Sequence, residues 1–186
     1  MEQDLRVWVG WDGNMPADAA IDPRHPDLGW RWIGADGTHP PGFDGDDAGP
    51  IDLWHARRIA AGVPQGPVDL VPERALMLEA GLDRIGAVDF SKGCYVGQEV
   101  TARTHYRGLV KRRIVPLQID AEQVTEGAEI TDGEAVIGSV LSLAAAGTQL
   151  LCLAAMKLSD LHRLLDDGGE IFVEGHVARL ALPDWM

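Results

Sequence analysis

Cysteine is scarce in this sequence. The 186 residues contain two cysteines, Cys94 and Cys152. A disulfide framework is therefore excluded as the basis of the fold, and a reducing compartment is expected. The cysteines and histidines show neither CxxC nor HxxxH spacing, so the sequence predicts no structural metal site.

Long apolar runs and basic charge are also in short supply. The longest apolar run, LLCLAAM at 150–156, is too short to cross a bilayer, and the start MEQDLR lacks the pattern of a signal peptide. We expect the cytoplasm of a bacterium or, in a eukaryote, the mitochondrial matrix. Sixteen basic residues face twenty-nine acidic ones, a net charge of -13, so direct nucleic-acid binding is not expected.

The first third of the chain has clear local signals. LRVWVGW at 5–11 alternates in the manner of a half-buried strand. Residues 34–50 are mostly Gly, Asp and Pro, which predicts a mobile loop. Residues 52–64 predict a helix that Asp52 caps and that ends near Gly62 and Pro64.

Two further helices are predicted before the midpoint. PERALMLEAG at 72–81 has Pro at its start and Gly at its end, and Leu76, Met77 and Ala80 would face the core. VTARTHY at 100–106 fits either a helix or an alternating strand. We favour the helix, with Gln98 and Glu99 in its first turn.

From Leu109 onward, short apolar runs alternate with glycine, which predicts a small β-barrel. One helix at 159–169 would interrupt the strands, with Ser159 as its cap and leucines 161, 164 and 165 facing inward. The predicted fold class is α+β, with an N-terminal domain at 1–108 and the barrel at 109–186.

The segment KGCYVGQE at 92–99 concentrates reactive side chains between two glycines. Gly93 and Gly97 allow a tight loop, and a helix beginning near Gly97 would place Cys94 beside its positive end. With Lys92 nearby, this setting favours the thiolate of Cys94. The alternative is a buried cysteine that acts as a small apolar residue.

The neighbouring polar residues leave alternatives open. Glu99 and Arg103 are four residues apart and could form a surface ion pair, or Glu99 could orient the loop. His105 is the nearest histidine to Cys94, and spacing alone does not make it a catalytic partner.

KGCYVGQE at 92–99 resembles the K-G-C-Y-x-G-Q-E signature of the YgfZ family of folate-binding proteins, relatives of the glycine-cleavage T-protein. DPRHPDLGWR at 22–31, DLWHARRIAAGVP at 52–64 and THYRGLVKRR at 104–113 also resemble segments of that family. The resemblance implies a partial T-protein-like folate-binding domain with ferredoxin-like elements, followed by the barrel. It also implies that an N-terminal portion of the folate domain precedes this chain in the family.

The resemblance assigns roles to particular residues. Trp54 would lie against the ring of a bound tetrahydrofolate, and Arg58, one helical turn away, would bind its glutamyl carboxylate. Without the resemblance, Trp54 reads as a core residue and Arg58 as a surface arginine. Iron–sulfur function would depend on Cys94 and Lys92, within a functional motif that includes Tyr95, Gly97, Gln98 and Glu99.

The implied function is tetrahydrofolate binding in support of iron–sulfur cluster assembly or repair, with folate, assembly proteins and client enzymes as partners. Effects on tRNA thiolation would pass through iron–sulfur enzymes. The alternatives are a folate-dependent aminomethyl transferase and an interaction module without a ligand. A basic run within 103–113, namely Arg103, Arg107, Lys111, Arg112 and Arg113, could attract a polyglutamyl tail, a phosphate or another anion, or could be a solvated strand edge.

Overall fold

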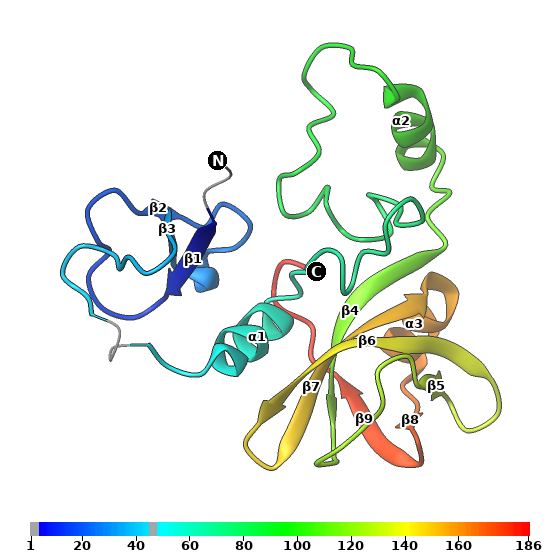
Figure 1. Ribbon diagram of the computed structural model, residues 1–186. Coiled ribbons are helices and arrows are strands. Elements are labelled where there is room, and N and C mark those ends of the chain that lie inside the picture. Colours follow the sequence, from blue (N-terminus) through cyan, green and yellow to red (C-terminus); the bar gives the residue numbers. More distant parts are fainter. Residues whose placement is uncertain (1–3, 45–47) are drawn as a thin grey trace.

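The computed structural model describes residues 4–44 and 48–186. A small N-terminal sheet and a C-terminal barrel are joined by helix α1, and a segment that carries helix α2 stands above the barrel (Figure 1). The mixed α/β fold class with a closed C-terminal barrel is confirmed. Of the helices in the described residues, none has both the length and the apolar character needed to cross a bilayer.

The N-terminal sheet is antiparallel, in the order β1-β3-β2. Its strands are β1 (Leu5–Gly10), β2 (Ala20–Ile21) and β3 (Trp30–Ala35), and a short 3-10 helix, η1 (Pro26–Leu28), precedes β3. The predicted strand at 5–11 is confirmed. The predicted loop at 34–50 begins two residues later than expected because β3 continues to Ala35, and its residues 45–47 lie outside the described part of the chain.

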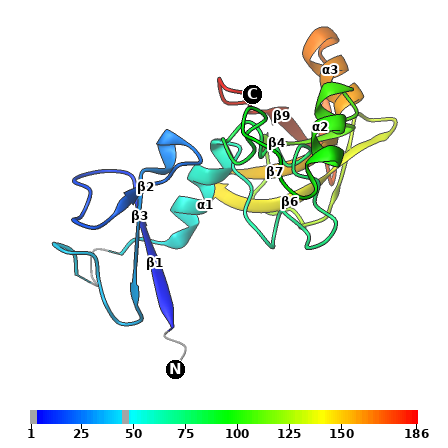
Figure 2. The same ribbon diagram turned by 90° about the horizontal axis from the view of Figure 1, so that it is seen from above.

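Helix α1 (Ile51–Ala60) confirms the helix predicted at 52–64. Asp52 was expected to cap it, but the cap position is Pro50 and Asp52 lies in the first turn, where its charge still favours the helix dipole. Gly62 has a φ of 67°, as a left-handed C-terminal residue requires. The helix lies between the N-terminal sheet and the barrel, as the view from above also shows (Figure 2).

The helix predicted at 72–81 is wrong. The chain forms successive turns there, and Glu73 has a positive φ of 63°, which a right-handed helix does not accept. The carbonyl of Glu79 accepts the N–H of Ile114 at 3.1 Å, so a tertiary hydrogen bond replaces a helical one. Ala80 is buried as predicted, whereas Leu76 and Met77 are exposed.

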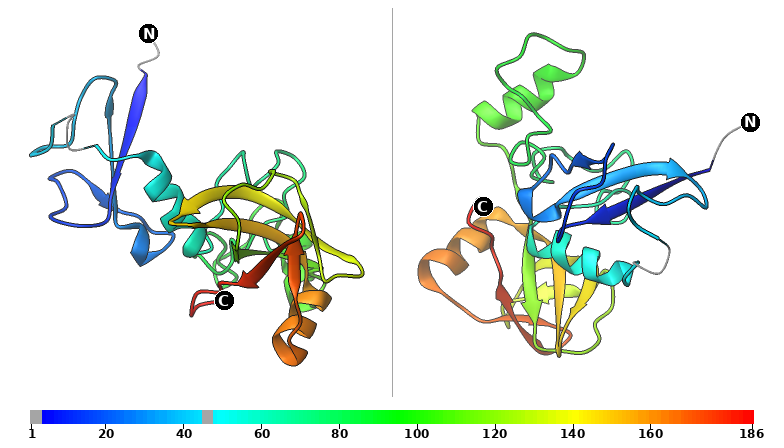
Figure 3. Two further views of the ribbon diagram at one scale, coloured as in Figure 1. Left: turned by 90° about the horizontal axis from the view of Figure 1, so that it is seen from below. Right: turned by 90° about the vertical axis from the view of Figure 1, so that its left-hand side faces the viewer.

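Helix α2 (Gln98–Tyr106) confirms the helix favoured for this segment. We call residues 88–110 the motif arm. Two views show this arm projecting away from the end of the barrel (Figures 1 and 3). Thr101 is its one residue in the buried class, and Phe90 stacks on His105 with ring centroids 3.9 Å apart. The arm therefore makes its aromatic contacts largely within itself.

Six strands close the barrel in the order β4-β7-β6-β5-β8-β9. They are β4 (Arg112–Ile119), β5 (Glu129–Thr131), β6 (Val136–Ala146), β7 (Gln149–Lys157), β8 (Ile171–Val173) and β9 (His176–Leu180). The longest pairing joins β4 to β7 from Arg112↔Lys157 to Ile119↔Leu150, and β9 closes the barrel against β4. Closure removes exposed sheet edges.

Alternating residues of these strands fill the barrel. The core includes Leu117, Ile130, Val140 and Met156, each at most 1% exposed. At about 25 cal/mol per Å² of apolar surface removed from water, this cluster is the main source of hydrophobic stability in the C-terminal half.

Helix α3 (Leu158–Asp167) covers one end of the barrel (Figure 1). It starts one residue before the expected cap Ser159, its cap position is Lys157, and no side chain caps it. Leu161 and Leu164 are buried as predicted. Leu165 was expected to face inward but is 52% exposed, because the buried stripe of this short helix is only two leucines wide.

Candidate functional site

The structure divides the residues singled out in the sequence between two places. The motif residues lie together on the motif arm, and Trp54 and Arg58 lie on α1. The two groups are therefore described in turn.

Cys94 is exposed on the loop that precedes α2. The helix begins at Gln98 after Gly97, whose φ of 87° places it in the left-handed region that glycine accepts without strain. The alternative of a buried apolar cysteine therefore does not hold for Cys94. It describes Cys152, which lies in the barrel core and is 0% exposed.

Gln98 orients the cysteine loop. Its side-chain Oε1 accepts the N–H of Tyr95 at 3.0 Å, and its Nε2 lies 4.0 Å from Cys94 Sγ in hydrogen-bonding geometry. One amide thus fixes the backbone after the cysteine and also contacts the thiol. The sequence had suggested Glu99 for the orienting role, and the 3.0 Å bond assigns it to Gln98.

Lys92 and Asp89 shape the other side of the loop. The carboxylate of Asp89 accepts the N–H of Ser91 at 2.7 Å and that of Lys92 at 3.3 Å, which forms an Asx turn. The Lys92 ammonium lies 5.0 Å from the centroid of the Tyr95 ring, in a cation–π contact. Lys92 therefore folds over the loop next to Cys94, and the loop presents the thiol to solvent.

Helix α2 supplies little further contact to the thiol. Glu99 is exposed, and the Glu99–Arg103 ion pair considered from spacing is not among the ion pairs of residues 4–44 and 48–186. His105 stacks on Phe90 and contacts Tyr106 edge-on at 5.0 Å. These rings hold the helix against the start of the arm.

The second place is an aromatic cavity of about 450 Å³ between the N-terminal sheet and α1. A volume of this size suits a small-molecule ligand. Its aromatic lining consists of Trp8, Trp11, Trp30, Phe43 and Trp54. The sequence had pointed to Trp54 alone; the density of tryptophan, six residues in the chain, was the available signal for the others.

Two indole N–H groups of this cavity's lining are without a partner. Trp30 and Trp54 are 6% and 8% exposed, and within the described residues neither Nε1 finds a hydrogen-bond acceptor. A buried donor without an acceptor costs about 1–3 kcal/mol.

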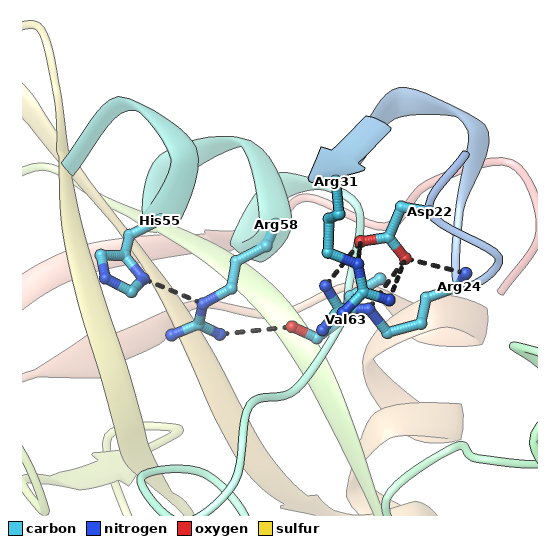
Figure 4. A network of polar contacts seen from close by, with 6 residues as sticks. All are labelled: Asp22, Arg24, Arg31, His55, Arg58 and Val63. Atoms are coloured by element: carbon cyan, nitrogen blue, oxygen red, sulfur yellow. Dashed lines mark hydrogen bonds and ion pairs between the residues drawn. The ribbon is translucent and has the colours of Figure 1, made fainter. Parts of the chain in front are cut away.

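Charged groups surround Trp54. The Arg24 guanidinium lies 5.7 Å from its ring centroid and is held there by Asp22, at 2.7 Å. Asp22 also pairs with Arg31 at 3.2 Å, as the close view shows (Figure 4). Burial raises the pKa of Asp22, but its hydrogen bonds and the charges of Arg24 and Arg31 outweigh this and hold the pKa below its usual value.

Arg58 is buried rather than on the surface. It is 2% exposed; its Nη1 donates to Asp69 Oδ2 at 2.8 Å and to the carbonyl of Val63 at 3.2 Å. Its Nε donates to His55 Nδ1 at 3.1 Å (Figure 4). The interpretation of Arg58 as a surface arginine is therefore wrong. In this arrangement Asp69, and not an external ligand, supplies the carboxylate.

Asp69 links α1 to the barrel. Its Oδ2 accepts the N–H of Gln65 as well as Arg58, both at 2.8 Å, and its Oδ1 accepts the N–H of Ser142 at 3.0 Å. Ser142 lies where the β6–β7 register shifts, between Val140 and Leu143. The irregularity frees a strand N–H for this contact. Sequence periodicity gave no signal for this link.

Metal-ligating residues do not gather in the described part of the chain. No three His, Cys, Asp or Glu side chains there form a group able to hold a metal ion. Among residues 4–44 and 48–186, Cys94 therefore does not belong to a set of three such ligands.

Known proteins are similar to the barrel by itself and to nearly the whole chain. Residues 111–186 match the family described as "CAF17, C-terminal beta-barrel domain". The human "Iron-sulfur cluster assembly factor IBA57, mitochondrial" is 36% identical over 205 residues, which cover 98% of this chain and 55% of the human protein.

Two further relatives match shorter regions. The mouse protein of the same name is 39% identical over 114 residues, covering 59% of this chain and 32% of the mouse protein. The homologue from Neurospora crassa is 43% identical over 101 residues, covering 54% of this chain and 23% of that protein. The chain thus spans about half the length of the human relative. The chain is similar to the IBA57 iron–sulfur cluster assembly factors along nearly its whole length, and its residues 111–186 match the C-terminal barrel domain of CAF17.

Proposed function

We propose that this protein supports the assembly or repair of iron–sulfur clusters through Cys94. The observation that carries the proposal is an exposed thiol in the KGCYVGQE loop, on an arm that stands clear of the barrel. A cluster in transit is cargo, so a single cysteine can supply one ligand while a partner protein supplies the others. The absence of a closed ligand set within the described residues agrees with such a shared site.

The surface of the motif arm suits contact with a partner. It exposes several large apolar side chains: Tyr95, Val96, Val100, Tyr106 and Leu109. Soluble proteins keep such groups at the surface chiefly where another molecule covers them. We infer that iron–sulfur assembly proteins or client enzymes dock here, in the mitochondrial matrix for a eukaryotic chain and in the cytoplasm for a bacterial one. Effects on tRNA thiolation would follow through the clients.

We further propose that the aromatic cavity beside Trp54 binds tetrahydrofolate or a derivative. The tryptophan rings that line the cavity offer flat faces for a pterin. Arg58 is not part of the proposed folate site, because its guanidinium is paired with Asp69. Bound folate would supply one-carbon chemistry, and the chain's residues would orient it and exclude water.

The Cys94 proposal is tested by complementation. Cells that lack their own homologue would receive the full-length protein, Cys94→Ala or the matched control Cys152→Ala, and iron–sulfur enzyme activities would be measured. We expect Cys94→Ala to fail at normal protein levels and Cys152→Ala to restore activity if it folds. Full rescue by Cys94→Ala would remove the thiol from the function.

The folate proposal is tested by anaerobic calorimetry with tetrahydrofolate. Trp54→Phe keeps an aromatic ring but offers a smaller face to the pterin, so affinity should fall about tenfold. Trp32→Phe, a tryptophan of β3 that does not line the cavity, is the control. Equal affinity for all three proteins would place folate elsewhere, and no binding by the full-length protein would remove folate from the proposal.

A further inference from the structure

The fold separates the basic run of the sequence into three environments. Arg103 lies on α2, and Arg107 follows directly after it. Arg113 turns inward, where its Nη1 donates to the Leu78 carbonyl and lies 3.3 Å from Asp83 Oδ1. Lys111 and Arg112 remain exposed at the start of β4. The run therefore does not act as one patch.

Tertiary structure brings a distant lysine to Lys111 and Arg112. β4 pairs with β7 in a register that places Arg112 directly opposite Lys157. Both belong to the outward-facing set of their strands, because the alternate residues, among them Val115 and Met156, fill the barrel. Two long cationic side chains thus leave the same face of the barrel side by side.

These cations line a cleft of about 530 Å³ where β4, β7 and α3 meet. Its lining consists of Val110, Lys111, Arg112, Lys157, Leu158, Ser159 and His162. The chain enters α3 here: the N–H of Leu158 donates to the carbonyl of Lys111 at 2.8 Å. We call this feature the cationic cleft.

Nothing in the described residues neutralises the cationic cleft. Lys111, Arg112 and Lys157 form no ion pair within residues 4–44 and 48–186, although the protein carries a net charge of -13. Lys157 donates only to a neutral group, the carbonyl of Val136, at 2.7 Å.

Two acids close to the start of α3 are paired with Arg163 instead of with the cleft. Asp160 lies 4.0 Å from Arg163, and Arg163 also pairs with Asp132 at 2.5 Å.

Like charges directly opposite in an antiparallel pair are destabilising. Arg112 and Lys157 nevertheless form such a pair in a protein rich in acidic residues, and Lys111 lies next to them. An anion bound between them would turn the repulsion into attraction. The arrangement therefore favours an anion near these two side chains.

We propose that the cationic cleft binds the phosphate group of a small phosphorylated ligand. A phosphate monoester carries about two negative charges at neutral pH and offers three acceptor oxygens, which matches three cations lining one cleft better than a single carboxylate does. The Arg112 guanidinium can donate two parallel hydrogen bonds, and Lys111 and Lys157 add point charges. Val110 and Leu158 provide an apolar wall for the remainder of the ligand.

The test is calorimetric titration of the full chain with inorganic pyrophosphate at low ionic strength. The double variant Arg112→Gln/Lys157→Gln should bind about tenfold more weakly or worse, since hydrogen bonds to charged groups are lost. The matched control Arg103→Gln/Arg107→Gln makes the same change of charge on the motif arm and should bind within about twofold of the wild type. Equal losses in both variants, or no binding by the wild type, would overturn the proposal.

A single variant separates binding from folding. Arg112→Gln removes the like-charge contact, so its Tm without ligand should equal or slightly exceed that of the wild type. Its Tm gain on adding pyrophosphate should shrink. A lower Tm without ligand together with an unchanged gain would make Arg112 a structural residue and contradict the proposal.

The phosphate could come from a soluble metabolite or from a lipid headgroup. Glycerol phosphate and phosphatidylcholine vesicles containing phosphatidic acid would be compared, each with the wild type and the Arg112→Gln/Lys157→Gln variant. Binding that the variant loses supports the site in either arm, and the tighter arm identifies the source. An acidic protein segment as the occupant would be indicated by binding to a polyglutamate peptide but to neither phosphate probe, which would refute the phosphate assignment.

Discussion

The barrel and the motif arm use the same kinds of residue for opposite purposes. Cys152 is fully buried in the barrel core, whereas Cys94 is exposed on the arm. Leucines and valines of the barrel pack against one another, and the apolar side chains of the arm face solvent. The contrast indicates that the barrel supplies stability, whereas the exposed thiol of the arm fits the partner contact that we propose.

The largest expected difference lies in thiol reactivity. Burial raises the pKa of Cys152 to about 12 from an ordinary 9.0, which leaves about a thousandfold less thiolate at neutral pH. Iodoacetamide should therefore label the exposed Cys94 far faster than Cys152, as followed by peptide mass spectrometry. Comparable labelling of the folded protein at both sites would break the comparison.

A buried and an exposed ion pair should also differ strongly in their contribution to the free energy of unfolding. Asp69→Asn leaves the buried Arg58 without its counter-charge, and breaking a buried ion pair from one side costs about 3–5 kcal/mol of unfolding free energy. Chemical denaturation would measure this loss. The exposed ion pair of Arg6 with Asp36 is the control, and Asp36→Asn should cost less than about 1 kcal/mol. A small effect of Asp69→Asn would mean that α1 is not tied to the barrel by this contact.

Truncating an apolar side chain should cost more stability in the barrel than on the motif arm. Leu117 is 0% exposed in the barrel, and Leu117→Ala should lower the free energy of unfolding by about 2–5 kcal/mol. Leu109 of the arm is 51% exposed, and Leu109→Ala should change it by no more than about 0.5 kcal/mol. Urea unfolding of both variants tests this. Equal losses would show that the arm contributes to the folded core.

Gln98 should affect chemistry without affecting stability. Gln98→Glu retains the acceptor for the Tyr95 N–H but places a carboxylate near Sγ, which disfavours the thiolate. Alkylation of Cys94 should slow about tenfold at neutral pH, because the added negative charge opposes the anionic form that reacts. Glu99→Gln, on the next residue, should not slow it. An unchanged rate in Gln98→Glu would mean that the 4.0 Å contact does not influence the thiol.

The smallest effect concerns acid stability near α1. Burial, together with the charge of Arg58, lowers the pKa of His55 below 6.5, so the folded protein favours the neutral ring that accepts the Arg58 Nε–H. This contribution is fully present above pH 6.5 and is lost as the pH falls through the lower folded pKa. His55→Gln should flatten the loss of stability below that pH, measured by thermal unfolding. A steeper loss in the variant would contradict the assigned direction.

Local signals in the sequence were sufficient where neighbours along the chain decide the structure. The alternating strands and glycine-rich turns predicted the barrel, and Gly62 with Pro64 predicted the end of α1, although the expected cap Asp52 lies in its first turn. They failed at 72–81, where the residues favour a helix but do not form one. Glu73 has a positive φ there, and the carbonyl of Glu79 forms a hydrogen bond with β4. Local propensity is weak enough for such tertiary contacts to override it.

The candidate sites divide in the same way. The chemistry of KGCYVGQE is local, so the sequence by itself determined that a thiol lies in a glycine-bounded loop before a helix. Only the tertiary structure decided that Gln98 orients that loop, that Asp69 takes the guanidinium of Arg58, and that Lys157 joins Arg112 in one cleft. These last two pairs join different structural elements. Their energies depend on desolvation and strand register, which no short stretch of sequence encodes.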